Sequence, residues 1–303
     1  MFKSLLGCKC FASRSGKRKT SLSFLALFLV FALLLPVSAG AWQSECPQHY
    51  SGGKPPVIEK QGLEKKAREV CFEDFGVVHS GIARTPVWSA EHVTREGLNQ
   101  AREIKRVDRF YPEPRLPKEE RAELENYSKT GFDRGHMAPS ANMRSRESQA
   151  ESFSLANIVP QNPESNRGIW AAIESSVRFL AREQGELYVV TGPVFFGEKL
   201  KRVGGRVLVP THIYKAVYDP KRGAAVYLVE NGPLQNYVTI SISELNRILG
   251  VDIFPALPLE WKQYKMRLPD VLVKSKGKNK DGVRWMYTES KGILVPFEDL
   301  LKK

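Results

Sequence analysis

The chain has 303 residues, of which 42% are apolar and 26% charged, and it carries a formal net charge of +13. This composition is typical of a globular protein and excludes a collagen-like, low-complexity or wholly disordered chain. The excess of lysine and arginine over acidic residues indicates an anionic partner without identifying it.

The first 41 residues have the pattern of a targeting segment. Residues 1–20 contain six basic side chains and no acidic one, and the apolar run SLSFLALFLVFALLLP follows at residues 21–36. The small residues VSAGA come next, so the pattern predicts a secretory signal peptide, cleaved before Gly40 or Trp42, and a periplasmic or secreted protein. The alternative is an uncleaved anchor that tethers the protein to a membrane. Removal of residues 1–41 lowers the charge to +7.

The four cysteines divide in the same way. Two of them leave with the targeting segment, and Cys46 and Cys71 remain. In an exported protein a lone pair most simply forms one disulfide, and a bridge at this spacing stabilises a chain by about 3 kcal/mol. A metal site is the weaker alternative, because two thiolates at this spacing are not a zinc framework. We therefore divide the chain into residues 1–41, an N-terminal segment 42–75 with the disulfide, and one main domain 76–303.

The first half of that remaining chain favours short elements. The pattern predicts a short helix at 59–72 and strands at 77–82 and 87–93. Residues 94–130 are dense in charge and proline, which favours a long surface loop with a helical turn. The simplest interpretation of these charges is a solvated face of the protein.

The second half begins with a clear helix. Apolar residues recur at helical spacing after Asn166, and Gly185 marks the end of that helix. A buried strand is predicted at 187–196, stopped by its Gly-Pro pair. Strands at 212–219 and 224–230 flank turn residues and predict a hairpin.

The last elements are a helix and a basic loop. Ser241 and Glu244 match a capping box that begins a short helix, which Gly250 ends. The run KSKGKNK at 274–280 is interpreted as an exposed loop. The order of the elements predicts an α+β fold with an antiparallel sheet.

The residues suited to catalysis concentrate between positions 131 and 174. Hydrolysis of a phosphodiester needs a base that activates water and a divalent cation that offsets the developing negative charge. Because Mg²⁺ keeps several waters, it takes only one or two protein oxygens. His136 can supply the base, Asn166 a neutral oxygen ligand, and Glu174, on roughly the same helix face, a partner for a metal-bound water. Taken singly, such residues are more often a structural histidine, a helix cap and a solvated glutamate.

Other catalytic motifs are absent from the sequence, including the P-loop, H-E-x-x-H and G-x-S-x-G patterns. The run Asp133-Arg134-Gly135-His136 within GFDRGHMAP resembles the D-R-G-H signature of the sugar-nonspecific DNA/RNA endonucleases. That family has a ββα-metal site and includes endonuclease G and secreted bacterial nucleases. The resemblance continues in order through SFSLANIVPQ, NRGIW, VVTGPVFF and VPTHIYKAVY, so it spans about residues 76–260.

This resemblance implies a ββα-metal nuclease fold, with a central antiparallel sheet flanked by helices, and a set of roles. His136 is expected to be the general base that deprotonates the attacking water. Asn166 is expected to be the single direct protein ligand of Mg²⁺, for which Mn²⁺ can substitute. Glu174 is expected to orient a metal-bound water.

The resemblance also implies supporting residues. Asn157 is expected to position His136 or the phosphate environment, and Asp133 and Arg134 to brace the site, with Arg134 near the phosphate.

Some relatives carry an upstream arginine that stabilises the pentacoordinate phosphate, but here alignment of RVDRFYPEP on its phenylalanine puts Asp108 at that place. Arg106 and Arg109 flank this aspartate, and we expect Arg109 to reach the phosphate.

The implied function is a Mg²⁺-dependent endonuclease that cuts DNA and RNA to 5′-phosphate ends. Binding to phosphate and metal reads no bases, and the basic charge adds salt-sensitive affinity. Relatives are often homodimers, which implies a dimer here. Two alternatives are an exported nucleic-acid-binding protein that kept the fold without catalysis and a phosphodiesterase for small esters. The complete set of His136, Asn166 and Glu174 favours the nuclease.

Overall fold

The computed structural model describes residues 43–290 apart from 235 and 280–281, and these described residues form one compact unit. The expected targeting segment and its cleavage sites therefore lie outside the described residues. No helix in the described part of the chain combines the length and the apolar character needed to cross a membrane.

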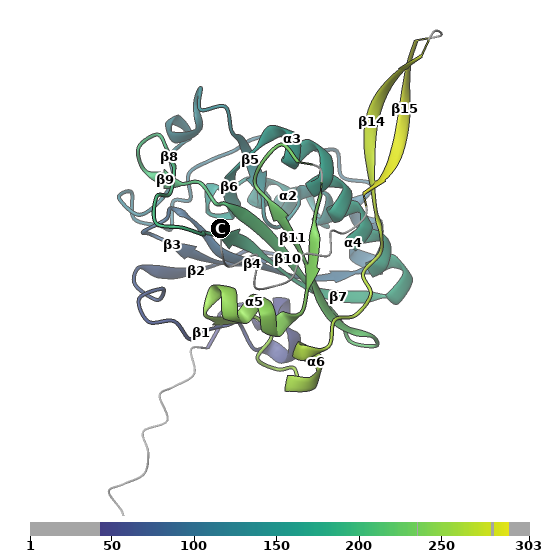
Figure 1. Ribbon diagram of the computed structural model, residues 1–303. Coiled ribbons are helices and arrows are strands. Elements are labelled where there is room, and N and C mark those ends of the chain that lie inside the picture. Colours follow the sequence, from purple (N-terminus) through teal and green to yellow (C-terminus); the bar gives the residue numbers. More distant parts are fainter. Residues whose placement is uncertain (1–42, 235, 280–281, 291–303) are drawn as a thin grey trace, which may run out of the picture. The chain divides into compact units, whose positions relative to one another are not determined.

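A seven-stranded antiparallel sheet forms the centre of this unit, in the order β12-β11-β10-β7-β4-β3-β2 (Figure 1). Four smaller two-stranded pairs surround it, namely β1 with β13, β5 with β6, β8 with β9, and β14 with β15. The strands of the central sheet are β2 (Ala67–Cys71), β3 (Gly76–Ser80), β4 (Thr85–Thr94), β7 (Glu186–Val194), β10 (His212–Asp219), β11 (Gly223–Glu230) and β12 (Val238–Ile240). The paired strands are β1 (Val57–Ile58), β5 (Asp133–His136), β6 (Ile158–Gln161), β8 (Arg202–Val203), β9 (Val207–Leu208), β13 (Val251–Asp252), β14 (Val271–Asn279) and β15 (Gly282–Ser290).

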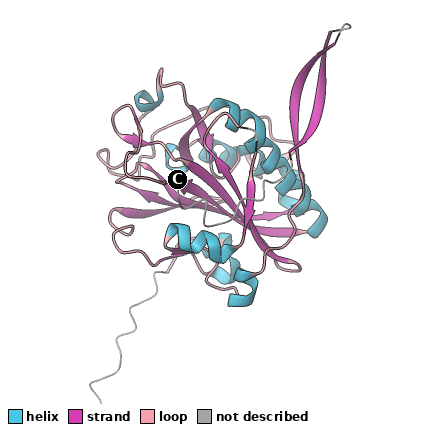
Figure 2. Ribbon diagram, in the orientation of Figure 1, coloured by secondary structure: helices cyan, strands magenta, loops and turns pink. Residues whose placement is uncertain are grey.

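Helices lie on both sides of this sheet, as Figure 2 shows. The α-helices are α1 (Arg95–Ala101), α2 (Arg146–Ser152), α3 (Pro163–Ser165), α4 (Ala171–Gln184), α5 (Ile242–Leu249) and α6 (Leu259–Gln263). The tighter 3-10 turns are η2 (Pro47–His49), η3 (Ser51–Gly53), η4 (Leu124–Tyr127), η5 (Ser140–Asn142) and η6 (Leu155–Asn157), and η7 (Asn166–Trp170) is a wider π-helical turn.

The two faces of the sheet support separate cores because successive residues of a strand point to opposite sides. On β10, Ile213 and Val217 pack in the cluster that contains the apolar residues of α4. Tyr214 and Ala216 of the same strand pack in the cluster that contains Leu245 of α5. We refer to these two sides as the α4 face and the α5 face.

The helix expected after Asn166 is confirmed. The side chain of Asn162 accepts hydrogen bonds from the backbone N–H groups of Glu164 and Ser165, which caps the helical segment that continues through η7 into α4. Gly185, with φ of 102°, ends α4 because a positive φ suits glycine. The hairpin of β10 and β11 and the capped helix α5 are also confirmed.

The helix expected at 59–72 is wrong, because residues 67–71 form strand β2 at the edge of the sheet and pair with β3. The expected loop at 274–280 is also wrong over residues 274–279, which belong to β14. Both strands depend on pairing with a second segment, which local spacing does not reveal.

The expected end of the strand at Gly192-Pro193 is wrong as well, since β7 continues to Val194. The last pair between β4 and β7 joins Ser89 to Thr191, so beyond that point β7 has no ladder partner on the β4 side. Proline is tolerated at such an edge because its missing N–H faces no acceptor.

The charged stretch 94–130 is only partly a solvated face, because Glu113 and Glu120 within it are buried and form ion pairs with arginines.

The Cys46–Cys71 disulfide is confirmed, with 5.7 Å between the Cα atoms. It joins the start of the described chain to the edge strand β2, and it excludes the metal alternative because both sulfurs are bonded.

Candidate active site

A cavity of about 480 Å³ lies beside β5 on the α4 side of the molecule. Its lining brings together His136 at the end of β5, Asn166 at the start of η7 and Glu174 in the first turn of α4. Arg134 also lines it. Residues separated by up to 40 positions in the sequence therefore meet in one site, as the D-R-G-H resemblance implies.

His136 lies in an aromatic environment and is 9% exposed. Its ring is 4.8 Å from that of Phe153, edge to face, and 5.4 Å from that of Phe110. Burial lowers the pKa of His136 to about 3, and the nearby charge of Arg106 adds to this effect. Its Nε2 is buried and has no hydrogen-bond partner among the described residues. The imidazole is therefore neutral near pH 7 and its Nε2 is unused, as a general base requires, while burial makes the protonated form costly.

Asn157 fixes the backbone that follows His136. Its Oδ1 accepts hydrogen bonds from the Ala138 N–H at 2.9 Å and from Ser89 Oγ at 2.8 Å. Its Nδ2 donates to the carbonyls of Ala138 and Ser152, each at 2.9 Å. Asn157 is fully buried and does not line the cavity, so it holds the strand end rather than a phosphate.

The glycine of the D-R-G-H motif leaves room for a side chain of the paired strand. A Cβ at Gly135 would collide with the side chain of Gln161, which belongs to the paired strand β6. Beside it, Asp133 accepts hydrogen bonds from Arg167 Nε at 2.8 Å and from Asn166 Nδ2 at 2.9 Å. Asp133 therefore orients the asparagine.

Asn166 offers an amide oxygen to the site, because its nitrogen is occupied by Asp133. An amide oxygen is a ligand that hard cations such as Mg²⁺ accept. Among the described residues, the one group of three close Cys, His or carboxylate ligands is Cys46, Glu69 and Cys71, which lies elsewhere and contains the disulfide. The donor set at the active site therefore fits a cation that keeps most of its waters.

Glu174 is half-buried, and burial raises its pKa, whereas the positive charges of Lys215, Arg178 and Arg106 oppose that rise. In a regular α-helix, a spacing of eight residues leaves an offset of about 80° around the axis. Hydrogen bonds in η7 span five residues rather than four, so the chain turns less per residue there. This wide turn reduces the offset and brings Asn166 and Glu174 toward one side.

The arginines are distributed differently from the sequence expectation. Arg106 lines the cavity, where its Nε contacts Asp108 at 2.5 Å. Arg134 lines it too, with its guanidinium 4.3 Å from the ring of Phe110. Arg109 is exposed and does not line the cavity. The structure thus places Arg106, rather than Arg109, beside His136.

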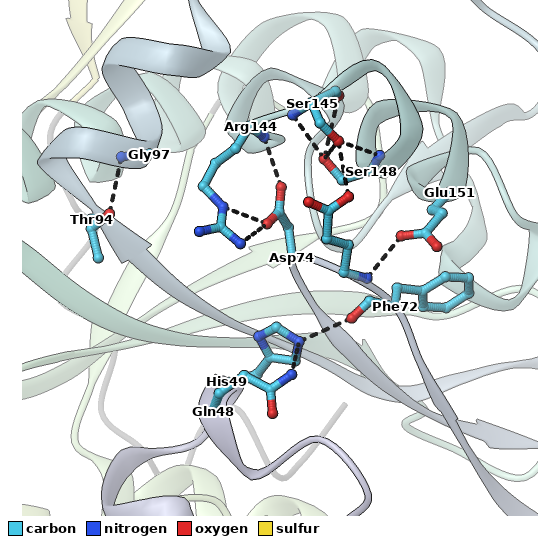
Figure 3. Close-up of polar contacts among 11 residues, drawn as sticks. Gln48, His49, Phe72, Asp74, Thr94, Gly97, Arg144, Ser145, Ser148 and Glu151 are labelled. Carbon is cyan, nitrogen blue, oxygen red and sulfur yellow. Dashed lines mark hydrogen bonds and ion pairs between the residues drawn. The ribbon is translucent and has the colours of Figure 1, made fainter.

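The segment that continues the cavity wall beyond Pro139 is anchored to the edge of the sheet, as Figure 3 shows. Asp74, in the turn after β2, accepts hydrogen bonds from the backbone N–H of Arg144 at 2.7 Å and from its Nε at 2.6 Å. Ser145 caps α2 by accepting from the N–H of Ser148 at 2.9 Å. Nearer the cavity, Asn142 Nδ2 donates to the buried Glu91 at 2.9 Å.

Sequence reasoning missed two features of this site. One is the wide turn η7. The other is Lys215, a fully buried lysine that contacts the residue after His136. The signal for Lys215 is its position between Ile213 and Val217 on one face of a strand, where an apolar residue is the norm.

The model of the DNA/RNA non-specific endonuclease family matches residues 54–260. The chain is 34% identical over 240 residues to the mitochondrial nuclease EXOG of Danio rerio, covering 71% of this chain and 69% of that protein. It is 28% identical over 242 residues to the mitochondrial endonuclease G of Bos taurus, covering 73% and 81%. It is 32% identical over 201 residues to the mitochondrial nuclease 1 of Schizosaccharomyces pombe, covering 58% and 62%.

A solved structure of an EndoG/EndoGI complex superposes with a TM-score of 0.58 at 23% identity, covering 69% of this chain and 94% of that one. This likeness confirms the expected α+β fold of the ββα-metal nucleases. The expected periplasmic or secreted localisation is wrong, because the relatives are named mitochondrial nucleases. A basic N-terminus without acidic residues is common to secretory and mitochondrial targeting segments, which explains the error.

Proposed function

Because the chain belongs to the DNA/RNA non-specific endonuclease family, we propose that it is a metal-dependent endonuclease that hydrolyses DNA and RNA and leaves 5′-phosphate ends. The observation that carries this proposal is the cavity itself. In it, the neutral His136, with an unpartnered Nε2, shares one lining with Asn166 and Glu174.

Asn166 would hold the metal through its amide oxygen, and Glu174 would accept hydrogen bonds from a metal-bound water. The favoured ion is Mg²⁺, for which Mn²⁺ can substitute, since both accept oxygen ligands. The cation supplies positive charge against the charge that develops on the phosphorane and the leaving oxygen. Asp133 contributes by fixing the orientation of the asparagine.

His136 would take the proton of the attacking water on its Nε2. The rings of Phe110 and Phe153 exclude bulk water from one side and keep the imidazole neutral. Arg134 and Arg106 line the cavity, where their positive charges would attract the phosphate oxygens. None of these groups distinguishes one base from another, which accounts for cleavage without sequence preference.

The test uses residues 42–303 and two variants, His136→Ala and His92→Ala. His92 lies outside the cavity, where it pairs with Glu186, and it controls for loss of an imidazole. Each protein is incubated with supercoiled plasmid and with RNA in Mg²⁺ or in EDTA. We expect cleavage only in Mg²⁺, a loss on the order of 10²-fold or more in His136→Ala, and near-parental activity in His92→Ala.

The products give a second readout. If the ends carry 5′-phosphates, polynucleotide kinase labels them only after phosphatase treatment. Binding of nucleic acid without cleavage in any divalent metal would contradict the proposal and favour a binding protein that kept the fold. Cleavage of small phosphodiesters but of neither polymer would favour the phosphodiesterase. The homodimer stays a prediction, which sedimentation of the same protein tests.

A further inference from the structure

Lys215 of β10 is 1% exposed and belongs to the largest fully buried side chains of the described chain. A lysine is rarely buried in this way without partners. Its Nζ donates to Thr191 Oγ1 of β7 at 2.7 Å and to the carbonyl of Met137 at 3.4 Å. It also lies 5.1 Å from the ring centre of Trp170, at the end of η7. One amino group therefore contacts the sheet, the residue after His136 and the turn that leads into α4.

Lys215 is part of a row of polar residues on the α4 face. Lys215 is paired with Thr191 across β10 and β7, and Thr191 is paired with Ser89 across β7 and β4. The hydroxyl of Ser89 donates to Asn157, which holds Ala138. Residues of this row thus hydrogen-bond, directly or through Asn157, to the backbone that follows His136.

The backbone of Met137 and Ala138 has all four of its hydrogen-bonding groups assigned. The N–H of Met137 donates to the carbonyl of Asn157, and the carbonyl of Met137 accepts from Lys215. Both backbone groups of Ala138 bond to the side chain of Asn157. Lys215 is the contact that does not come from Asn157, and its ammonium group hydrogen-bonds this segment to β10.

The charges around Lys215 connect it to the other side of the site. Burial lowers the pKa of Lys215, the charges of Glu174 of α4 and Glu91 of β4 oppose this effect, and the charge of Arg178 of α4 adds to it. In return, the charge of Lys215 opposes the burial effect on Glu174. The lysine thus lies between the strand that carries the base and the helix that carries the acidic residue.

We propose that Lys215 is a positioning residue for phosphodiester hydrolysis, which fixes the backbone after His136 relative to η7 and α4 through its contacts with Met137, Thr191 and Trp170. This inference rests on the proposed function. A buried charge is weak evidence for stability, because replacing a buried ion pair as a whole by apolar residues of similar size often leaves the folding free energy unchanged or improves it, whereas removing one partner alone is destabilising. We therefore infer that the lysine serves to position the backbone after His136 rather than to stabilise the fold.

The test compares Lys215→Met with Lys221→Met. Lys221 lies in the turn after β10, is exposed and donates to the carbonyl of Gln184, so its variant controls for the loss of one positive charge. We expect Lys215→Met to melt below the parent temperature, because the carbonyl of Met137 and the carboxylates of Glu91 and Glu174 lose a buried partner. In the folded fraction, kcat should fall on the order of 10²-fold, because small displacements of catalytic groups have effects of this size. KM should stay within a few-fold of the parent value, and Lys221→Met should behave as the parent.

A double-variant cycle separates positioning from folding. If Lys215 acts through His136, Lys215→Met should lower the residual rate of His136→Ala only slightly. A defect of folding would lower both rates by the same factor. Thr191→Val removes the acceptor with little change in shape, and it should show a smaller loss in kcat with KM unchanged, which keeps the test valid if Lys215→Met does not fold.

An active parent with parental kcat in folded Lys215→Met overturns the positioning role and leaves the proposed function intact. A loss in kcat that follows the unfolded fraction and disappears on cooling also overturns it. A parent that cuts neither substrate overturns the proposed function, and this inference with it.

Discussion

The two faces of the central sheet are built from the same strands but differ in what they bury. On the α4 face, strands β4, β7 and β10 present Ser89, Glu91, Thr191 and Lys215, all fully buried. On the α5 face, β4 and β10 present mostly apolar residues, such as Trp88 and Ala216.

Burial of polar groups costs free energy unless they are hydrogen-bonded, so a row of them needs a reason. On the α4 face each one contacts a segment of the active site or a neighbour that does. Both faces thus carry an apolar core, and the α4 face in addition supplies geometry to the active site. Variants of apolar residues on the α5 face should therefore change stability without changing kcat.

The largest expected effect on stability lies on the α5 face. Leu245 of α5 is fully buried, and Leu245→Ala should lower the free energy of unfolding by about 3 kcal/mol, as cavities in cores do. Urea denaturation measures this loss, and kcat of the folded fraction should stay within two-fold of the parent. A large fall in kcat without a change in stability would erase the distinction between the faces.

An effect of similar size, but dependent on pH, is expected on the α4 face. Burial raises the pKa of Glu91 from 4.5 to about 7. The folded protein then holds a proton that the unfolded chain releases, so this group contributes stability below pH 4.5 and loses it as the pH rises through 7. This difference in pKa between the unfolded and the folded state corresponds to about 3 kcal/mol of unfolding free energy.

Glu91→Gln removes this titration while its side-chain oxygen can still accept from Asn142. Unfolding free energies at pH 4.5 and 8 should show the parent losing about 3 kcal/mol more than the variant over that range. Buried His79, with a pKa lowered to about 4, is present in both proteins and acts in the opposite direction, so its effect cancels in the comparison. Parallel pH curves would contradict the raised pKa.

The same contrast shows how much of the molecule the sequence predicts. The α4 helix, the β10–β11 hairpin and the cap of α5 follow from local spacing, because their periodicity and end residues lie within a few positions. Strand β2 is predicted as a helix although its partner β3 follows within a few positions, because the short run Ala67–Cys71 carries charged residues and its disulfide partner Cys46 lies 25 positions away.

At the site, the family resemblance predicts His136, Asn166 and Glu174, and the structure brings all three into the lining of one cavity. Local sequence does not show the partners of Lys215, because Met137, Thr191 and Trp170 come from three separate segments.

The smallest expected effect tests the cavity rim. Alignment with the family favours Arg109 as the phosphate cation, whereas the structure places Arg106 in the cavity lining and leaves Arg109 outside. Arg106→Ala should therefore lower kcat about ten-fold through loss of charge next to the phosphate, an effect near 1.4 kcal/mol. Arg109→Ala should change kcat by less than two-fold. Both lose one positive charge, so both should bind DNA slightly more weakly at low salt.

Kinetics on a plasmid substrate at two salt concentrations separate the effect on catalysis from the effect on DNA binding. A cation that only attracts the polymer makes KM depend on salt and leaves kcat unchanged. The Arg106–Asp108 pair is more than half exposed, so it contributes little to folding, and neither variant should change the melting temperature. If Arg109→Ala shows the larger loss in kcat, the alignment is right, and the rim must rearrange when substrate binds. If Arg106→Ala shows the larger loss in kcat, Arg106 already lies in position for the phosphate before substrate binds, just as the backbone after His136 is already held by the residues of the α4 face.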